Sequence, residues 1–158
     1  GLKDFLETAR KVPEVDFYWF GKIFGDKMAG KKAREAIKNS PDNVKFTGFV
    51  DDIREAYALG DIFFYPTKTE NQGIPALEAG YCGKPLVLRD IDAFDEVFSD
   101  KEDCLKKKNL EGFVDAIELL VDNPELSEEL GSEAKSTAEE HTIESVSFRL
   151  EDLYRSFE

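Results

Sequence analysis

The chain has 158 residues, of which 41% are hydrophobic, and its 34 acidic and 21 basic side chains give a formal net charge of −13. This length fits one domain with a core of its own, and the negative charge argues against a nucleic-acid surface and against docking of this portion on anionic lipid. No apolar run approaches the roughly 20 residues of a membrane helix, and one His and two Cys cannot form a metal-ligand set by themselves.

The first part of the chain alternates between helical and strand-like patterns. An apolar stripe from Leu2 to Ala9 predicts a helix that ends near Pro13. The elements that follow are predicted as a buried strand over 15–20, a short basic helix over 31–39, a strand over 44–47 and a helix capped by Asp51 or Asp52.

Residues 61–88 predict a strand, a loop, a helix and a second strand. The apolar, aromatic run 62–65 is the first strand, and the polar run 67–72 is the loop. Pro75 suits the first turn of the helix, and Gly83 ends it before the second strand. The loop therefore ends at a helix N-terminus, where free N–H groups and a partial positive charge can hold a phosphate or an oxyanion.

The remainder is predicted to be mostly helical. After an irregular acidic segment and a short strand at 104–105, the helices are one capped by Asn109, one opened by Pro124 and closed by Gly131, one over 132–140 and one capped by Thr142. We expect the C-terminal helical segment, about 142–157, to pack back on the domain through Val146, Leu150, Leu153 and Tyr154.

Strands that alternate with helices predict an α/β fold with a doubly wound parallel sheet. In such sheets, ligands bind beyond the carboxyl ends of the strands. The loops expected to ring one cleft there are Gly21–Lys22–Ile23, Gly48–Phe49–Val50, Thr67–Gly73 and Arg89–Phe94.

Two carboxylates, Glu70 and Glu78, frame the helix N-terminus of the central unit. A glutamate pair with seven residues between its members carries no weight alone in a chain this acidic. Its surroundings make the signal specific, namely Pro66, Thr67, Gly73, Ala79, Gly83 and Pro85. This pattern resembles the signature of retaining GT-B glycosyltransferases, in particular the GT4 family, and the resemblance covers the chain from Gly1 to about Tyr154.

The resemblance implies a Rossmann-like domain that is the C-terminal, donor-binding half of a two-domain enzyme. Glu78 would bind the ribose hydroxyls of a nucleotide-sugar donor, and Glu70 would face the transferred sugar as the candidate catalytic residue. The backbone amides expected to meet sugar hydroxyls and phosphate are those of Asn71, Gln72, Gly73 and Ile74. Many relatives carry Gly and Phe in place of Asn71 and Gln72, and this pair is similar to a membrane-glycolipid branch of the family.

The remaining donor contacts follow from the same resemblance. The loop Gly48–Phe49–Val50 would line the base, and Lys22, after Gly21, and Lys68 are the cations best placed to meet the donor. The reaction implied is transfer of a hexose from a nucleoside-diphosphate sugar to a glycan or lipid acceptor with retention, without a metal or other cofactor. The sugar, the base and the acceptor stay open.

The family's first strand would lie upstream of Gly1. We therefore expect residues 1–158 to be a single-domain fragment of a longer enzyme, and the strands at 15–20 and 62–65 not to be hydrogen-bonded to each other. The fragment would bind donor without turnover, because its partner, the N-terminal acceptor domain, is missing. We expect a cytoplasmic protein, with contact to the inner membrane face only through that missing half.

Three other interpretations fit parts of the sequence. Asp90 and Asp92 mimic the carboxylate pair of metal-dependent glycosyltransferases, although the GT-B pattern needs no metal. A sugar-nucleotide epimerase shares the two-half fold, but the proline-flanked glutamate unit favours transfer. A flavodoxin-like regulatory domain would use Asp51–Asp52 and a lysine at a strand end, whereas Lys84 precedes a strand.

Overall fold

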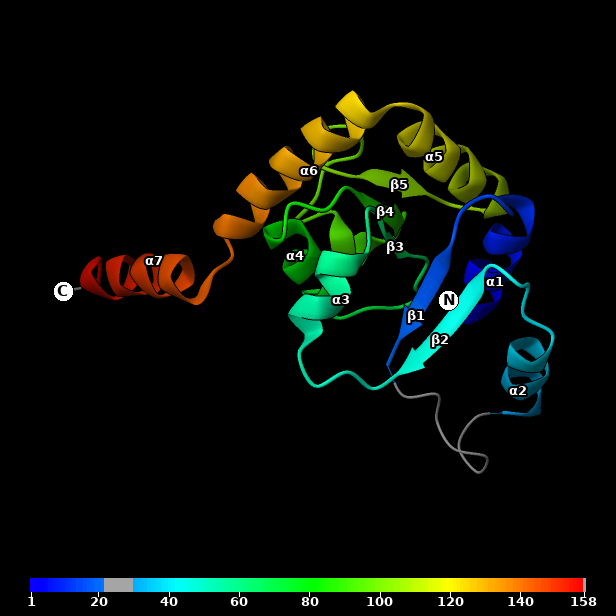
Figure 1. Ribbon diagram of the computed structural model, residues 1–158. Helices are drawn as coiled ribbons and strands as arrows, with labels where there is room; N and C mark the ends of the chain where they lie inside the picture. Colours follow the sequence, from blue (N-terminus) through cyan, green and yellow to red (C-terminus); the bar gives the residue numbers. More distant parts are fainter. Residues whose placement is uncertain (22–29, 158) are drawn as a thin grey trace.

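The structure is a computed structural model that describes residues 1–21 and 30–157, and Lys22, one of the predicted donor contacts, lies outside this part (Figure 1). Its elements alternate as the sequence predicts. They are α1 (Leu2–Lys11), β1 (Phe17–Phe20), α2 (Lys31–Lys38), β2 (Val44–Gly48), α3 (Ile53–Leu59), β3 (Phe63–Tyr65), α4 (Ile74–Tyr81), β4 (Leu86–Arg89), the 3-10 turn η1 (Asp92–Phe94), β5 (Leu105–Lys107), α5 (Leu110–Asp122), α6 (Pro124–Glu139) and α7 (Ile143–Arg155).

All strand pairs of the described residues are parallel, which confirms the predicted α/β class. They form two sheets, one of β1 and β2 and one in the order β3-β4-β5. β1 and β3 are not partners in either sheet, so the predicted absence of pairing between these two strands is also confirmed. Within each sheet the carboxyl ends of the parallel strands share one edge, and the loops that follow β2, β3 and β4 leave from these edges.

Aromatic side chains hold the two sheets against each other. Phe5 of α1 stacks on Phe64 of β3, with ring centroids 5.7 Å apart, and meets Phe17 of β1 edge-on at 5.4 Å. Phe17 and Phe64 in turn lie 6.3 Å apart. Packing of these rings, rather than a hydrogen-bonded ladder, therefore joins the β1 side of the domain to the β3 side.

Strand β4 is buried on both of its faces, as a central parallel strand should be. Val87 belongs to a core with α1 and α5, whereas Leu86 and Leu88 point into a second core with Tyr57, α4 and Phe94. The side chains of β3 divide in the same way, because Phe64 packs on the first core and Phe63 and Tyr65 pack on the second. The second core lies directly beneath α4 and its preceding loop.

The prediction that Gly131 closes a helix is wrong, because α6 continues through it to Glu139. Gly131 is buried, and a Cβ there would overlap the carbonyl oxygen of Gly83. Gly131 therefore permits close approach of α6 to the turn after α4. The low helix propensity of glycine does not end α6 there, because this packing offsets it.

The prediction that the C-terminal segment packs back on the domain is also wrong. α7 leaves the end of α6 and points away from the rest of the domain (Figure 1), and none of its residues is buried. The predicted face of Val146, Leu150, Leu153 and Tyr154 is exposed. An amphipathic pattern shows that a helix has an apolar face, but not which surface covers it. Within residues 1–21 and 30–157, no helix has the length and hydrophobicity of a membrane span.

Candidate functional site

The loop after β3 ends at Gly73, which is the N-cap of α4 and has φ 66° and ψ 33°. This left-handed conformation favours glycine. A Cβ at this position would also overlap the ring of buried Phe94, which lies directly beneath the turn. Gly73 is therefore required both by the backbone angle and by the close approach, and it fixes where the first turn of α4 begins.

Glu70 is held onto this loop by two donors. The hydroxyl of Tyr65 donates to Oε2 of Glu70 at 2.6 Å, and the backbone N–H of Asn71 donates to Oε1 at 2.9 Å. Together they lower the pKa of Glu70 below its ordinary value, with the Tyr65 hydroxyl as the larger cause. Burial and this hydrogen bond raise the pKa of Tyr65 to about 12. Near neutral pH, an ionised carboxylate thus accepts from a neutral phenol.

Glu78 lies on α4, about one turn after the N-cap Gly73, and faces α3. Its Oε2 accepts a 2.7 Å hydrogen bond from the hydroxyl of Tyr57, a residue of α3 that is only 8% exposed. Burial raises the pKa of Tyr57, and the bond to Glu78 adds to the shift. Glu78 itself is exposed, and no residue in the described part of the chain donates to its Oε1. One oxygen is therefore anchored and the other keeps its capacity to accept.

The loop residues that lead into α4 and its first residue are open to solvent, whereas the N-cap Gly73 is buried. Asn71, Gln72 and Ile74 are all exposed, Ile74 to 54%. Of the backbone amides predicted to meet a donor, that of Asn71 is occupied by the Glu70 carboxylate in this structure. The Glu70 carboxylate thus accepts from one of the N–H groups that were predicted to bind the donor.

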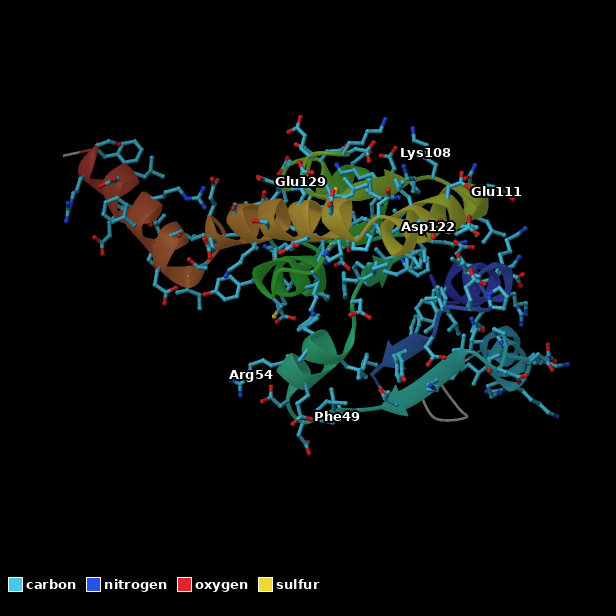
Figure 2. All side chains as sticks on the ribbon, turned by 45° about the horizontal axis from the view of Figure 1, so that its top comes forward. Phe49, Arg54, Lys108, Glu111, Asp122 and Glu129 are labelled. Atoms are coloured by element: carbon cyan, nitrogen blue, oxygen red, sulfur yellow. The ribbon has the colours of Figure 1, made fainter. Side chains whose placement is uncertain are left out.

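The residue that follows β1 is hydrogen-bonded to the last residue of β2. The backbone N–H of Gly21 donates to the carbonyl of Gly48 at 2.8 Å. Phe49 follows at the surface, where β2 leads into α3 (Figure 2), and Val50 is half-buried. Since α3 carries Tyr57, the predicted base-binding loop leads directly into the helix that supports Glu78.

Lys68 lies on the other side of the Glu70 loop, with its Nζ 3.7 Å from Oδ2 of Asp4 on α1. Asp4 is also ion-paired with Arg89 at the end of β4, and Arg89 donates to the carbonyl of Pro66 at 3.2 Å. Its guanidinium lies over the Phe113 ring, 4.9 Å from the centroid. This network ties the start of the site loop to α1 and α5.

Sequence reasoning missed Tyr57 and Tyr65 as parts of the site, and it placed Arg89 only in a loop around the expected cleft, without its partners. The two tyrosines were read only as apolar positions of a helix and a strand. The one available signal is that a buried tyrosine hydroxyl needs a hydrogen-bond partner. The partner of Tyr57 lies 21 residues away and that of Arg89 lies 85 residues away, so no local pattern could identify them.

One carboxylate of each alternative acidic pair is ion-paired with a basic side chain. Asp90 lies 3.3 Å from the Lys108 ammonium. Asp52 caps α3 by accepting from the Arg54 N–H, and the Arg54 guanidinium is the main cause that lowers the pKa of Asp52 to about 2. In the part of the chain that the structure describes, no three His, Cys, Asp or Glu side chains come together as a metal site.

The family model described as glycosyl transferases group 1 matches residues 1–137. The chain belongs to this family. Among the relatives of this glycosyltransferase domain is the processive diacylglycerol alpha-glucosyltransferase of Acholeplasma laidlawii, 33% identical over 98% of this chain. The alpha-galactosylglucosyldiacylglycerol synthase of Streptococcus pneumoniae is 31% identical over 91% of this chain. The chain spans 46% and 39% of the length of these two relatives.

Solved structures share the fold of the domain. Sucrose-phosphate synthase from Thermosynechococcus elongatus superposes with a TM-score of 0.86 at 20% identity, over 99% of this chain and 42% of that one. Anabaena HepE in complex with UDP-glucose gives a TM-score of 0.83 at 20% identity, over 99% of this chain and 45% of that one. These likenesses show that the domain has the α/β, Rossmann-like fold of these structures.

Proposed function

We propose that this domain is the donor-binding half of a retaining glycosyltransferase that moves a hexose from a nucleoside-diphosphate sugar to a lipid or glycan acceptor. The observation that carries the proposal is the pair of carboxylates, Glu70 and Glu78, on either side of an exposed helix N-terminus at the carboxyl edge of the sheet. The family match and the relatives' names agree with it.

In this proposal Glu78 binds the ribose of the donor. The residue is exposed and its Oε2 is held by Tyr57, so Oε1 can accept from ribose hydroxyls while the carboxylate keeps its support. A hydrogen bond to a charged group contributes about 1.5–3 kcal/mol. The loop Gly48–Phe49–Val50, which leads into α3, would then lie beside the base.

The diphosphate and the sugar would lie at the first turn of α4. Retaining transfer breaks the bond between the anomeric carbon and the diphosphate oxygen, and the electron pair leaves with the diphosphate. The acceptor's hydroxyl oxygen forms the new bond on the same face of that carbon, and its proton goes to the departing diphosphate. The N-terminal amides of α4 would stabilise that developing charge electrostatically, and Lys68 of the same loop would turn from its ion pair with Asp4 to supply a cation. Glu70, ionised and anchored by Tyr65, faces the sugar end, and no metal or other cofactor is required.

We propose a membrane lipid as the acceptor, bound by a second domain that this chain does not include. Two relatives at 33% and 31% identity are named for diacylglycerol lipids, and this chain spans less than half of either. Their names favour a glycolipid product over a soluble glycan. Contact with the inner membrane face would then run through the acceptor-binding half, in a cytoplasmic enzyme.

Titration calorimetry with UDP, GDP and ADP tests the donor assignment. We expect one of the three to bind the purified protein, and Glu78→Gln to weaken it by about 10–100-fold, the loss of one charged hydrogen bond. Glu129→Gln is the matched control, because Glu129 is exposed on α6, far from Phe49 in Figure 2. Failure of all three nucleotides to bind, or equal binding by Glu78→Gln, would overturn the assignment.

Analysis of the products of an enzyme that contains both halves distinguishes a transferase from the alternative, an epimerase. A transferase releases nucleoside diphosphate only when a lipid acceptor is added, and it does so in the presence of EDTA if no metal is required. Conversion of the sugar nucleotide to its epimer without release of diphosphate would reject transfer.

A further inference from the structure

We infer that Tyr57 and Tyr65 are positioning residues of the donor site, each fixing the direction of one signature carboxylate. The inference rests on the proposed function and adds to it a support for Glu78 on α3 and a support for Glu70 on β3. Neither tyrosine is expected to touch the donor. Each acts through the carboxylate that accepts its hydroxyl hydrogen bond.

Tyr57 determines which oxygen of Glu78 a ligand can reach. The side chain of an exposed glutamate on a helix samples several rotamers, and ordering it on binding costs free energy. The 2.7 Å bond from Tyr57 removes that freedom beforehand, because the phenol is itself buried in the second core. Oε2 is thereby directed toward α3 and Oε1 remains for the donor.

Tyr65 acts in the same way on Glu70, but at the other end of the donor. It is the last residue of β3, so its ring is fixed by the sheet while its hydroxyl reaches the loop five residues later. The Tyr65 hydroxyl, at 2.6 Å, and the Asn71 amide each donate to one oxygen of the Glu70 carboxylate. Glu70 is therefore presented in one orientation on a loop whose neighbouring side chains are exposed.

A continuous row of aromatic rings connects the two supports. Tyr57 lies 6.0 Å from Phe63, Phe63 lies 5.6 Å from Tyr65, and Tyr65 lies 6.2 Å from Phe94, measured between ring centroids. Phe94 is the ring on which Gly73 packs. One packed row thus sets the relative positions of Glu78, Glu70 and the N-cap of α4, which is the kind of rigid support that a precise binding site needs.

Substitution by phenylalanine removes each hydroxyl and keeps the ring in the row. The probes are UDP and UDP-glucose, or the corresponding pair for whichever base the nucleotide panel selects. We expect Tyr57→Phe to weaken both probes by about 3–20-fold, since the ribose is common to them, and Tyr65→Phe to weaken UDP-glucose at least threefold while leaving UDP unchanged. Tyr154→Phe, on exposed α7, is the control and should change neither.

A double-mutant cycle separates positioning from a merely structural role. If Tyr57 acts through Glu78, Tyr57→Phe should cost no further affinity in a Glu78→Gln background, and the corresponding result should hold for Tyr65→Phe with Glu70→Gln and UDP-glucose. The same loss in both backgrounds, or unchanged affinity in the single variants, would overturn the inference. If the wild-type protein binds no nucleotide, both the function and the inference fail, whereas normal wild-type binding with unaffected Phe variants rejects the inference alone.

Discussion

Helices α4 and α7 both begin at clear local signals, yet their environments are opposite. α4 has eight residues and buries Ala76, Ala79 and Gly80 against the sheet and α6. α7 has thirteen residues and buries none, although it carries larger apolar side chains. The comparison shows that a helix is buried when neighbouring elements can pack closely against it. The number of apolar side chains on the helix does not decide this.

Small residues explain the close packing of α4. A Cβ added at Gly80 would come within 3.0 Å of the Ala134 carbonyl oxygen on α6, so the two helices meet almost backbone to backbone. The larger residues Ile74 and Tyr81 lie on the opposite, exposed side with Glu78. On α4, therefore, the buried face is the one with the small side chains, and the exposed face is the one that carries the candidate site.

The largest expected difference between the two regions is the cost of truncating a phenylalanine. Phe94→Ala removes a fully buried ring from the core beneath α4 and should reduce the free energy of unfolding by about 3–5 kcal/mol. Phe148→Ala, on α7 and 65% exposed, should change it by less than about 0.5 kcal/mol. Urea unfolding followed by circular dichroism measures both. A loss above about 1 kcal/mol for Phe148→Ala would mean that α7 is packed, and the comparison would fail.

A smaller difference in the loss of stability is expected between alanine substitutions at the two glycines that flank α4. Both have positive φ, 66° at Gly73 and 70° at Gly83. An added Cβ meets the Phe94 ring at Gly73 and nothing within 4 Å at Gly83. Gly73→Ala should therefore reduce the free energy of unfolding by about 2–4 kcal/mol and Gly83→Ala by only about 1–2 kcal/mol. Equal losses in urea titrations would show that the contact with Phe94 contributes nothing.

The smallest expected effect is a pH dependence that belongs to the α4 region alone. Because the pKa of Glu70 is lowered in the folded protein, its stabilising contribution is present above the ordinary value of 4.5 and is lost as the pH falls through the folded value. Tyr65→Phe removes the main cause. Because solvent screens this largely exposed carboxylate, the loss of stability should be at most about 1 kcal/mol at pH 7 and smaller at pH 3.5. Tyr154→Phe on α7 should show no such change. A cost for Tyr65→Phe that is independent of pH would contradict this origin of the shift.

The local features of the fold could be predicted from the sequence. The caps of α3, α5 and α7 are Asp52, Asn109 and Thr142, and each accepts a backbone N–H bond from a residue two or three positions later. Such bonds depend only on neighbours in the chain. The Gly73 turn and the two glutamates were also placed correctly around the start of α4, because turn chemistry and spacing are local too.

Features that depend on distant contacts could not be predicted in the same way. Gly131 appeared to end a helix because its partner, the Gly83 carbonyl, is visible only in three dimensions. The bond from Tyr57 to Glu78 joins two helices across 21 positions. The exposure of α7 depends on which surfaces lie nearby, and the periodicity of its apolar residues does not contain that information. The unpaired edges of β1 and β3 were predicted only through the family resemblance.

The central claim is that a nucleotide-sugar donor binds at the first turn of α4 between Glu70 and Glu78. The most direct test is to follow backbone amide NMR signals during titration of the protein with UDP-glucose. The account predicts saturable shifts at residues 71–74 and 48–50, with the signals of α5 and α7 unchanged. Saturable shifts confined to α5 or α7, or none at millimolar UDP-glucose, GDP-glucose and ADP-glucose, would contradict it.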